Sequence, residues 1–170
     1  MNSTPLDSSM ARADISASVN KYIPKLNNGD WKIRKEGIDA IELLLTQNNN
    51  KIKLDGLYDF ISVLKSKIND PNKTLVKIFI TFAGRFVEAC GKDIKNHCKP
   101  ILLSIISHLS DKQGIVRSEA NTSIDKIAGI LGKEQVINCM LGFICEDSVE
   151  MKVNILNYIF CNPDGFKKCD

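Results

Sequence analysis

The residues of this sequence that are capable of chemistry do not combine into a catalytic set. The two histidines, His97 and His108, are not accompanied by a serine-nucleophile motif or a glycine-rich phosphate loop. Glu36 and Asp39 have helical spacing, which is more typical of a solvated helix surface than of an acid–base pair. We therefore predict that the chain is not an enzyme. We also expect His108, near the end of an apolar helix, to be a structural residue.

The cysteines carry no metal motif. No two of them form a C-x-x-C pair, and the adjacent His97 and Cys98 lack the second pair of ligands that a zinc site needs. The N-terminus is polar and lacks the apolar centre of a signal peptide, which predicts a reducing compartment and free thiols. We expect no metal and no cofactor. The cysteines predicted to be small core residues on helices are Cys90, Cys139, Cys145 and Cys161.

Charged residues recur instead in a turn that appears several times along the sequence. Each copy follows an apolar segment, contains an aspartate, and leads into a helix that opens with an aliphatic residue followed by a basic one. These basic residues lie 43, 40 and 35 positions apart, and they are Arg34, Lys77, Arg117 and Lys152. This period fits two antiparallel helices per unit, the signature of HEAT-type repeats, which usually bind other macromolecules.

The apolar pattern between the turns predicts the helices that position them. Paired helical stripes occur in each of about four units, and no strand alternation persists. The first helix is predicted over 14–26, with a bend or an early end at Pro24. We predict an all-α protein, an α-solenoid of about four HEAT-type helical hairpins over residues 14–161. Residues 1–13 are expected to form a disordered lead-in and residues 162–170 a C-terminal tail.

Equivalent turns of stacked hairpins align along one edge, which predicts a ridge of basic character. Lysine or arginine in the first turn of a helix opposes its dipole by about 0.3–1 kcal/mol, so another role for these residues is indicated. In HEAT repeats such a basic residue commonly pairs with the turn aspartate of a neighbouring unit, and the successive ion pairs form a ladder along the turns. That alternative applies to Arg34 and Arg117. It does not apply to Lys32, Lys73 and Lys112, which precede the helix proper and have no ladder to join.

Trp31 is the single tryptophan, and it stands in the first of these polar turns. A large aromatic side chain there can bury much area on a partner. The alternative is that it folds back onto the first helix pair. Together with the basic turns it completes the predicted binding residues: Trp31, Lys32, Arg34, Asn72, Lys73, Lys112, Arg117 and Lys152.

Two of the turns resemble those of a known family. Residues 29–37 read GDWKIRKEG and residues 69–76 read NDPNKTLV. They are similar to turns of TOG domains, which occur in arrays in the microtubule polymerases and in CLASP proteins; the second is most like later TOG domains of the polymerases. The resemblance covers residues 14–131. It implies a paddle-shaped solenoid whose intra-repeat turns bind αβ-tubulin. Trp31 would contact β-tubulin, and Asn72, Lys73, Lys112 and Arg117 would continue the contact toward α-tubulin.

A TOG domain usually has six repeats and this sequence shows four, which implies a fragment of a longer protein or a shortened domain. We predict a tubulin- or microtubule-binding module of a larger microtubule-growth regulator. We expect it to be monomeric and located in the cytoplasm on the cytoskeleton, at microtubules, the spindle or the centrosome. No apolar run reaches the roughly 18 residues of a membrane span. The alternatives are a generic HEAT scaffold and a HEAT-like nucleic-acid-binding domain, although a net charge of +3 is low for the latter.

Overall fold

Helices account for almost all of the regular structure in the computed structural model, which describes residues 12–144 and 149–161. The elements in chain order are α1 (Ser16–Asn20), α2 (Ile23–Leu26), α3 (Trp31–Gln47), α4 (Tyr58–Lys67), α5 (Lys73–Cys90), the 3-10 helix η1 (Gly91–Ile94), α6 (Lys95–Ile106), the 3-10 helix η2 (Ser107–Ser110), α7 (Gly114–Leu131), α8 (Lys133–Ile144) and α9 (Val149–Cys161). The only strand-like pairing in this part of the chain is one bridge between Ala13 and Ile52. Within these residues, no helix is long and apolar enough to cross a membrane.

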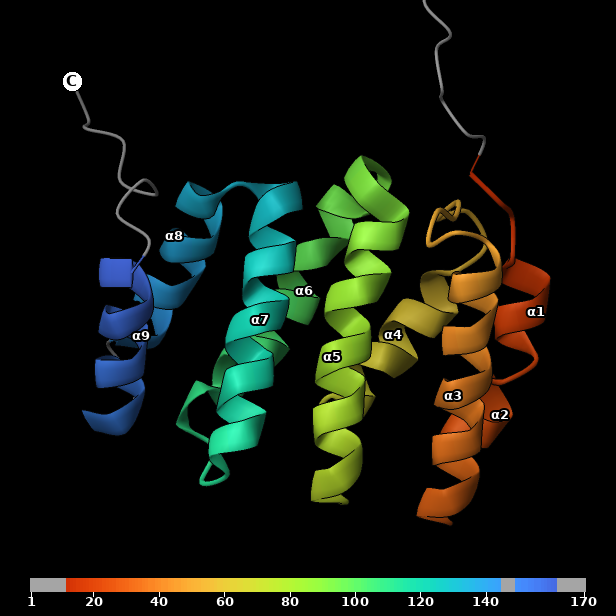
Figure 1. Ribbon diagram of the computed structural model, residues 1–170, viewed down its shortest axis with the longest axis horizontal. Coiled ribbons are helices and arrows are strands. Elements are labelled where there is room, and N and C mark those ends of the chain that lie inside the picture. The colour runs from red at the N-terminus through yellow and green to blue at the C-terminus, as the bar shows by residue number, and fades with distance from the viewer. Residues whose placement is uncertain (1–11, 145–148, 162–170) are drawn as a thin grey trace, which may run out of the picture.

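The helices form two layers (Figure 1). Helices α3, α5, α7 and α9 run side by side in one layer, and the shorter helices that precede each of them form the other. The N-terminal ends of these long helices lie along one edge of the molecule, the lower edge in the view. The predicted all-α solenoid of HEAT-type hairpins is therefore confirmed, and it brings the predicted turns to a common edge.

Local signals set the ends of the long helices. Asp30 caps α3 by accepting a hydrogen bond from the Lys32 amide at 2.8 Å, and Asn72 caps α5 by accepting from the Thr74 amide at 2.9 Å. Helix α5 ends at Cys90, and the next residue, Gly91, has a φ of 61°, a positive value that glycine tolerates. The helix predicted over 14–26 is two short helices, and Pro24 lies in the first turn of α2, where no amide hydrogen is needed.

The core is densest where α5 packs against its neighbours. Phe79, Phe82 and Phe86 are at most 1% exposed, and the Phe60 ring meets the Phe82 and Phe86 rings edge-on at centroid distances of 6.0 and 5.2 Å. This burial on several sides is what the broad apolar surface of α5 requires in the middle of a solenoid. The two helices of the second repeat, α4 and α5, are thus joined through these rings.

Helices α5 and α7 approach each other closely at Gly84 and Ser123. The Ser123 hydroxyl is buried and donates a hydrogen bond to the Ile80 carbonyl at 2.9 Å. A Cβ atom at position 84 would stand only 2.9 Å from the Ser123 Oγ. Glycine at this position therefore allows the two helices to pack at this distance.

The beginning of the described chain is bound to the loop after α3. The Ala13 amide donates to the Lys51 carbonyl at 3.1 Å, and Arg12 Nη1 donates to the Ala89 carbonyl at 2.6 Å. These two residues of the predicted disordered lead-in therefore pack on the solenoid, because Ala13 pairs with the backbone of the loop after α3 and Arg12 pairs with the backbone near the end of α5. The rest of the lead-in, 1–11, and the predicted tail, 162–170, lie outside the described residues.

The cysteines follow the prediction only in part. Cys90 is buried as expected, and burial raises the pKa of its thiol to about 12. Cys161 is exposed, so its predicted place in the core is wrong; it is the last described residue of α9. Cys98 is buried although it was not among the predicted core cysteines, and Cys145 lies outside the described residues. The described residues hold no cluster of potential metal ligands.

Candidate functional site

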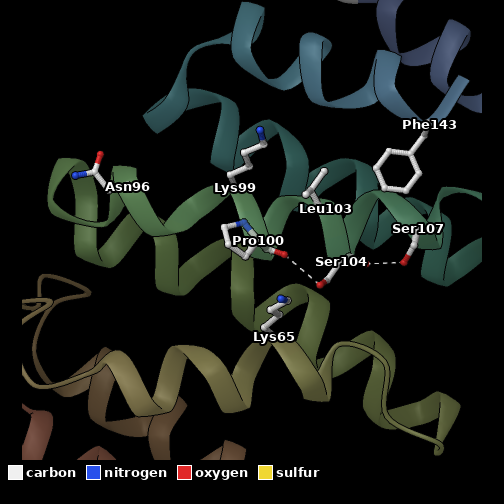
Figure 2. A pocket seen from close by; sticks show the side chains of 8 residues that line it. All are labelled: Lys65, Asn96, Lys99, Pro100, Leu103, Ser104, Ser107 and Phe143. Atoms are coloured by element: carbon white, nitrogen blue, oxygen red, sulfur yellow. Dashed lines mark hydrogen bonds between the residues drawn. The ribbon is translucent and has the colours of Figure 1, made fainter. Parts of the chain in front are cut away.

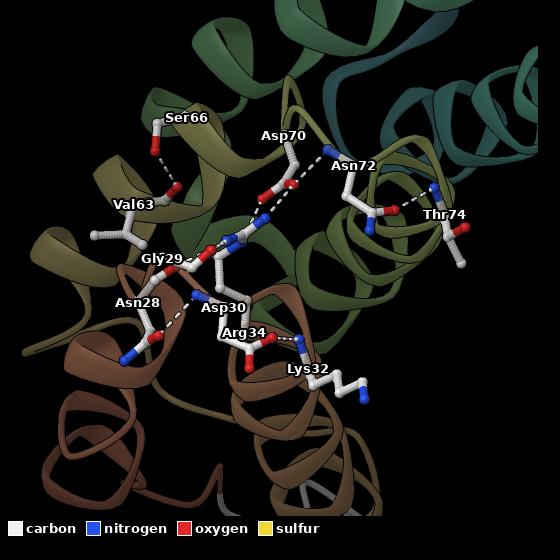
Figure 3. Close-up of polar contacts among 10 residues, drawn as sticks. All are labelled: Asn28, Gly29, Asp30, Lys32, Arg34, Val63, Ser66, Asp70, Asn72 and Thr74. Carbon is white, nitrogen blue, oxygen red and sulfur yellow. Dashed lines mark hydrogen bonds and ion pairs between the residues drawn. The ribbon is translucent and has the colours of Figure 1, made fainter.

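The first turn is tied to the second by a buried ion pair (Figure 3). Arg34 donates from Nε and Nη2 to the two carboxylate oxygens of Asp70, both at 2.8 Å. Its Nη1 donates to the carbonyls of Asn28 and Gly29 in its own turn, also at 2.8 Å. Asp70 in turn accepts from the Asn72 amide at 2.8 Å. The ladder role expected for Arg34 is confirmed.

The burial of Arg34 and Asp70 affects the prediction that Arg34 is a binding residue. Arg34 is 6% exposed and Asp70 4% exposed. The guanidinium group therefore fixes the turns, and its charge is not presented to a partner. We accordingly leave Arg34 out of the surface considered below.

The second turn is tied to the third by a different residue from the one expected. Lys73 Nζ lies 2.9 Å from Asp111 Oδ2, so the expectation that Lys73 has no ladder to join is wrong. Helix α5 begins at Lys73, which places this side chain nearer the next turn than Lys77, one helical turn further on. Lys77 lines a hollow between α3, α5 and α7, together with Glu42 and Glu119. Unlike Arg34, Lys73 remains well exposed, with 57% of its side chain accessible.

The third turn repeats the arrangement of the first. Arg117 Nη1 donates to the carbonyls of Asp111 and Lys112 at 2.6 and 3.3 Å, as Arg34 does to its own turn. The aspartate of the fourth turn, Asp147, lies outside the described residues, so the expected pairing of Arg117 with the next unit is not observed here. Lys152 lies half-buried on α9.

A buried histidine completes the third turn, and the repeat pattern alone did not indicate its partners. His108 Nε2 lies 3.1 Å from Asn69 Oδ1, and its Nδ1 lies 3.6 Å from Asp111 Oδ2. Burial lowers the pKa of His108 below its ordinary value, against the opposing effect of Asp111. Burial alone would raise the pKa of Asp111, but the Gln113 amide and Lys73 hold it below its ordinary value.

The residues that remain at least partly exposed along this edge form the turn ridge, by which we mean Trp31, Lys32, Asn72, Lys73 and Lys112. Trp31 is 40% exposed at the first position of α3, so much of the indole faces solvent. Lys32 and Lys112 are exposed, and Asn72 is half-buried as the cap of α5. The structure thus brings the predicted residues of three turns to one edge, with the aspartates and arginines beneath them.

Several solved structures share this fold of stacked helical hairpins. A chain from work on microtubule plus-end tracking by XMAP215, CLIP-170 and EB1 matches with a TM-score of 0.79 and 21% identity, over 92% of this chain and 68% of that one. A chain from work on tubulin recruitment by microtubule polymerases with TOG domain arrays matches with a TM-score of 0.80 and 14% identity, over 95% and 34%. The TOG array protein crescerin gives a TM-score of 0.66 at 18% identity, over 84% and 58%.

Sequence comparison adds curated relatives. Protein MOR1 of Oryza sativa subsp. japonica is 29% identical over 117 residues, and Protein MOR1 of Arabidopsis thaliana is 28% identical over 130 residues. They cover 68% and 76% of this chain. Centrosomal protein 224 of Dictyostelium discoideum is 25% identical over 97% of it. The chain spans only 6–8% of the length of these relatives. No family model matches the chain. The predicted resemblance to TOG domains is confirmed.

Proposed function

We propose that this chain is a non-enzymatic tubulin-binding module that holds αβ-tubulin along the turn ridge. The observation that carries the proposal is that α3, α5 and α7 of a solenoid with the TOG fold begin along one edge, and that Trp31, Lys32, Lys73 and Lys112 lie exposed at or just before these helix starts. One solved structure with this fold comes from polymerases that recruit and assemble tubulin. The small share of the relatives' length that the chain covers supports a place within a larger microtubule-growth regulator on the cytoskeleton.

The two kinds of exposed residue would contribute differently. Trp31 offers apolar area that a partner can desolvate, and interface tryptophans of this kind contribute about 2 kcal/mol or more. The lysines offer exposed positive charge, which attracts an acidic partner such as tubulin and is weakened by salt. The ridge therefore combines one apolar anchor with a row of charges.

The ion pairs between neighbouring turns would hold these contacts in register. Arg34 and Asp70 fix the first turn against the second, and Lys73 and Asp111 fix the second against the third. The turn ridge is therefore already ordered without a partner, which limits the entropy cost of binding.

The test is a fluorescence titration of the chain with purified αβ-tubulin, comparing wild type with Trp31→Ala. The matched control is Tyr58→Ala, which removes another exposed aromatic side chain from the opposite layer of helices. We expect Trp31→Ala to weaken binding by about 2 kcal/mol and Tyr58→Ala to leave it unchanged. Equal binding by wild type and Trp31→Ala would contradict the proposal.

A further inference from the structure

A groove of about 590 Å³ lies in the layer of helices that does not carry the turn ridge (Figure 2). It is bounded by α4, α6 and α8, with one residue from η2. Its lining contains two lysines and no acidic residue. The lining residues are Lys65, Asn96, Lys99, Pro100, Leu103, Ser104, Ser107 and Phe143.

The floor of the groove is apolar. Leu103 of α6 and Phe143 of α8 are half-buried and point into the same space in Figure 2, beside Pro100. The groove thus offers a surface for an apolar side chain.

The rim of the groove is positively charged without compensation. Lys65 and Lys99 are exposed, stand on either side of Pro100 and Leu103 in Figure 2, and form no ion pair with the described residues.

The two serines do not change this balance. The Ser104 hydroxyl donates to the Pro100 carbonyl at 3.1 Å, and the Ser107 hydroxyl donates to the Ser104 carbonyl at 2.8 Å. Both hydrogens are therefore used within the helix. Recognition of a negatively charged group falls to Lys65 and Lys99.

We propose that this groove binds an extended acidic peptide segment of a partner protein. An apolar side chain of that segment would lie against Leu103 and Phe143, and its carboxylates would meet Lys65 and Lys99. The lining holds no arginine, whose planar fork is the usual means of gripping a phosphate. Carboxylates, which single ammonium groups can pair with, suit the site better.

The test uses fluorescence anisotropy with the full 170-residue chain and a fluorescein-labelled peptide in which glutamates flank a central phenylalanine. The double variant Lys65→Glu/Lys99→Glu should weaken binding at least about tenfold, because attraction becomes repulsion at two sites. Lys65→Arg/Lys99→Arg should keep the binding. The matched control Lys21→Glu/Lys51→Glu makes the same change of net charge at exposed positions away from the groove, and should bind as wild type.

Further comparisons identify the occupant. Replacing the phenylalanine of the probe by alanine should weaken binding, and a probe with lysines in place of glutamates should not bind. Thermal melting curves of the two charge-reversed variants that match the wild-type curve establish that folding is intact. Failure of wild type to bind the probe would overturn the proposal, as would equal weakening by the control variant. Tighter binding of a phosphoserine peptide or of duplex DNA would also overturn it. Because no probe contains tubulin, these outcomes are independent of the function proposed for the turn ridge.

Discussion

Arg34 and Asp70 form a two-point ion pair that joins the first two turns across 36 positions of sequence, with both side chains almost fully buried. Such a pair is costly to break on one side, because the remaining charge is left buried without its partner. The pair therefore fixes the relative position of the two turns more strongly than exposed ion pairs would.

Asp70→Ala should lower the free energy of unfolding by about 3–5 kcal/mol, since it leaves Arg34 buried and unpaired. Urea denaturation measures the change. The control is Lys25→Ala, which removes an exposed pair with Glu36 and should change stability by at most about 1 kcal/mol. If both variants unfold at the same urea concentration, the buried pair does not have this role.

Phe82→Ala should cost about 3–5 kcal/mol, because it removes a ring that is 1% exposed between neighbouring repeats. Phe160 provides a control of the same residue type, since it is 77% exposed on α9. Phe160→Ala should change the thermal midpoint little. A loss below about 1 kcal/mol for Phe82→Ala would mean that the core does not depend on this ring.

Stability should fall as the pH is lowered through the titration range of histidine. Burial holds the pKa of His108 below the ordinary value of 6.5, so the unfolded chain binds a proton that the folded chain does not. The contribution of His108 to the free energy of unfolding is then complete at pH values above 6.5 and declines as the pH falls below 6.5. Urea midpoints at pH 7.5 and pH 5.5 should differ more for wild type than for His108→Asn. His97→Asn is the control and should keep the wild-type difference.

Salt should separate the two kinds of contact on the turn ridge. Lys112→Ala should weaken tubulin binding at low salt and have little effect at high salt, because exposed charges are screened. Trp31→Ala should keep most of its effect at both salt concentrations. Titration of αβ-tubulin at two ionic strengths measures this. An equal salt dependence for the two variants would contradict the assigned roles.

Much of the fold could be predicted because its signals are local. Helical stripes, capping residues such as Asp30 and the glycine stop at Gly91 depend on neighbours within a few positions. The TOG resemblance depends on turns that are also short and local. The burial of Phe79 and Phe82 can likewise be predicted from the broad apolar surface of helix α5.

The pairings across repeats were harder to predict, because they depend on how neighbouring turns stack. Whether Lys73 or Lys77 reaches the next turn depends on where α5 begins, and a difference of one helical turn decides it. The contact between His108 and Asn69 spans 39 positions and has no local signature. The groove lined by Lys65 and Phe143 arises only where three helices from different repeats meet.

The close approach of α5 and α7 at Gly84 and Ser123 has a consequence for the spacing along the edge. Because only the small Ser123 side chain separates the helices there, this contact in the core, and not the lengths of the loops, limits how far the second turn lies from the third. A larger residue at position 84 would push the two helices apart and carry Lys73 and Lys112 with them. The spacing of the turn ridge is therefore fixed by a contact in the core. A partner that binds across the second and third turns must match a distance that depends on Gly84, although it does not touch this residue.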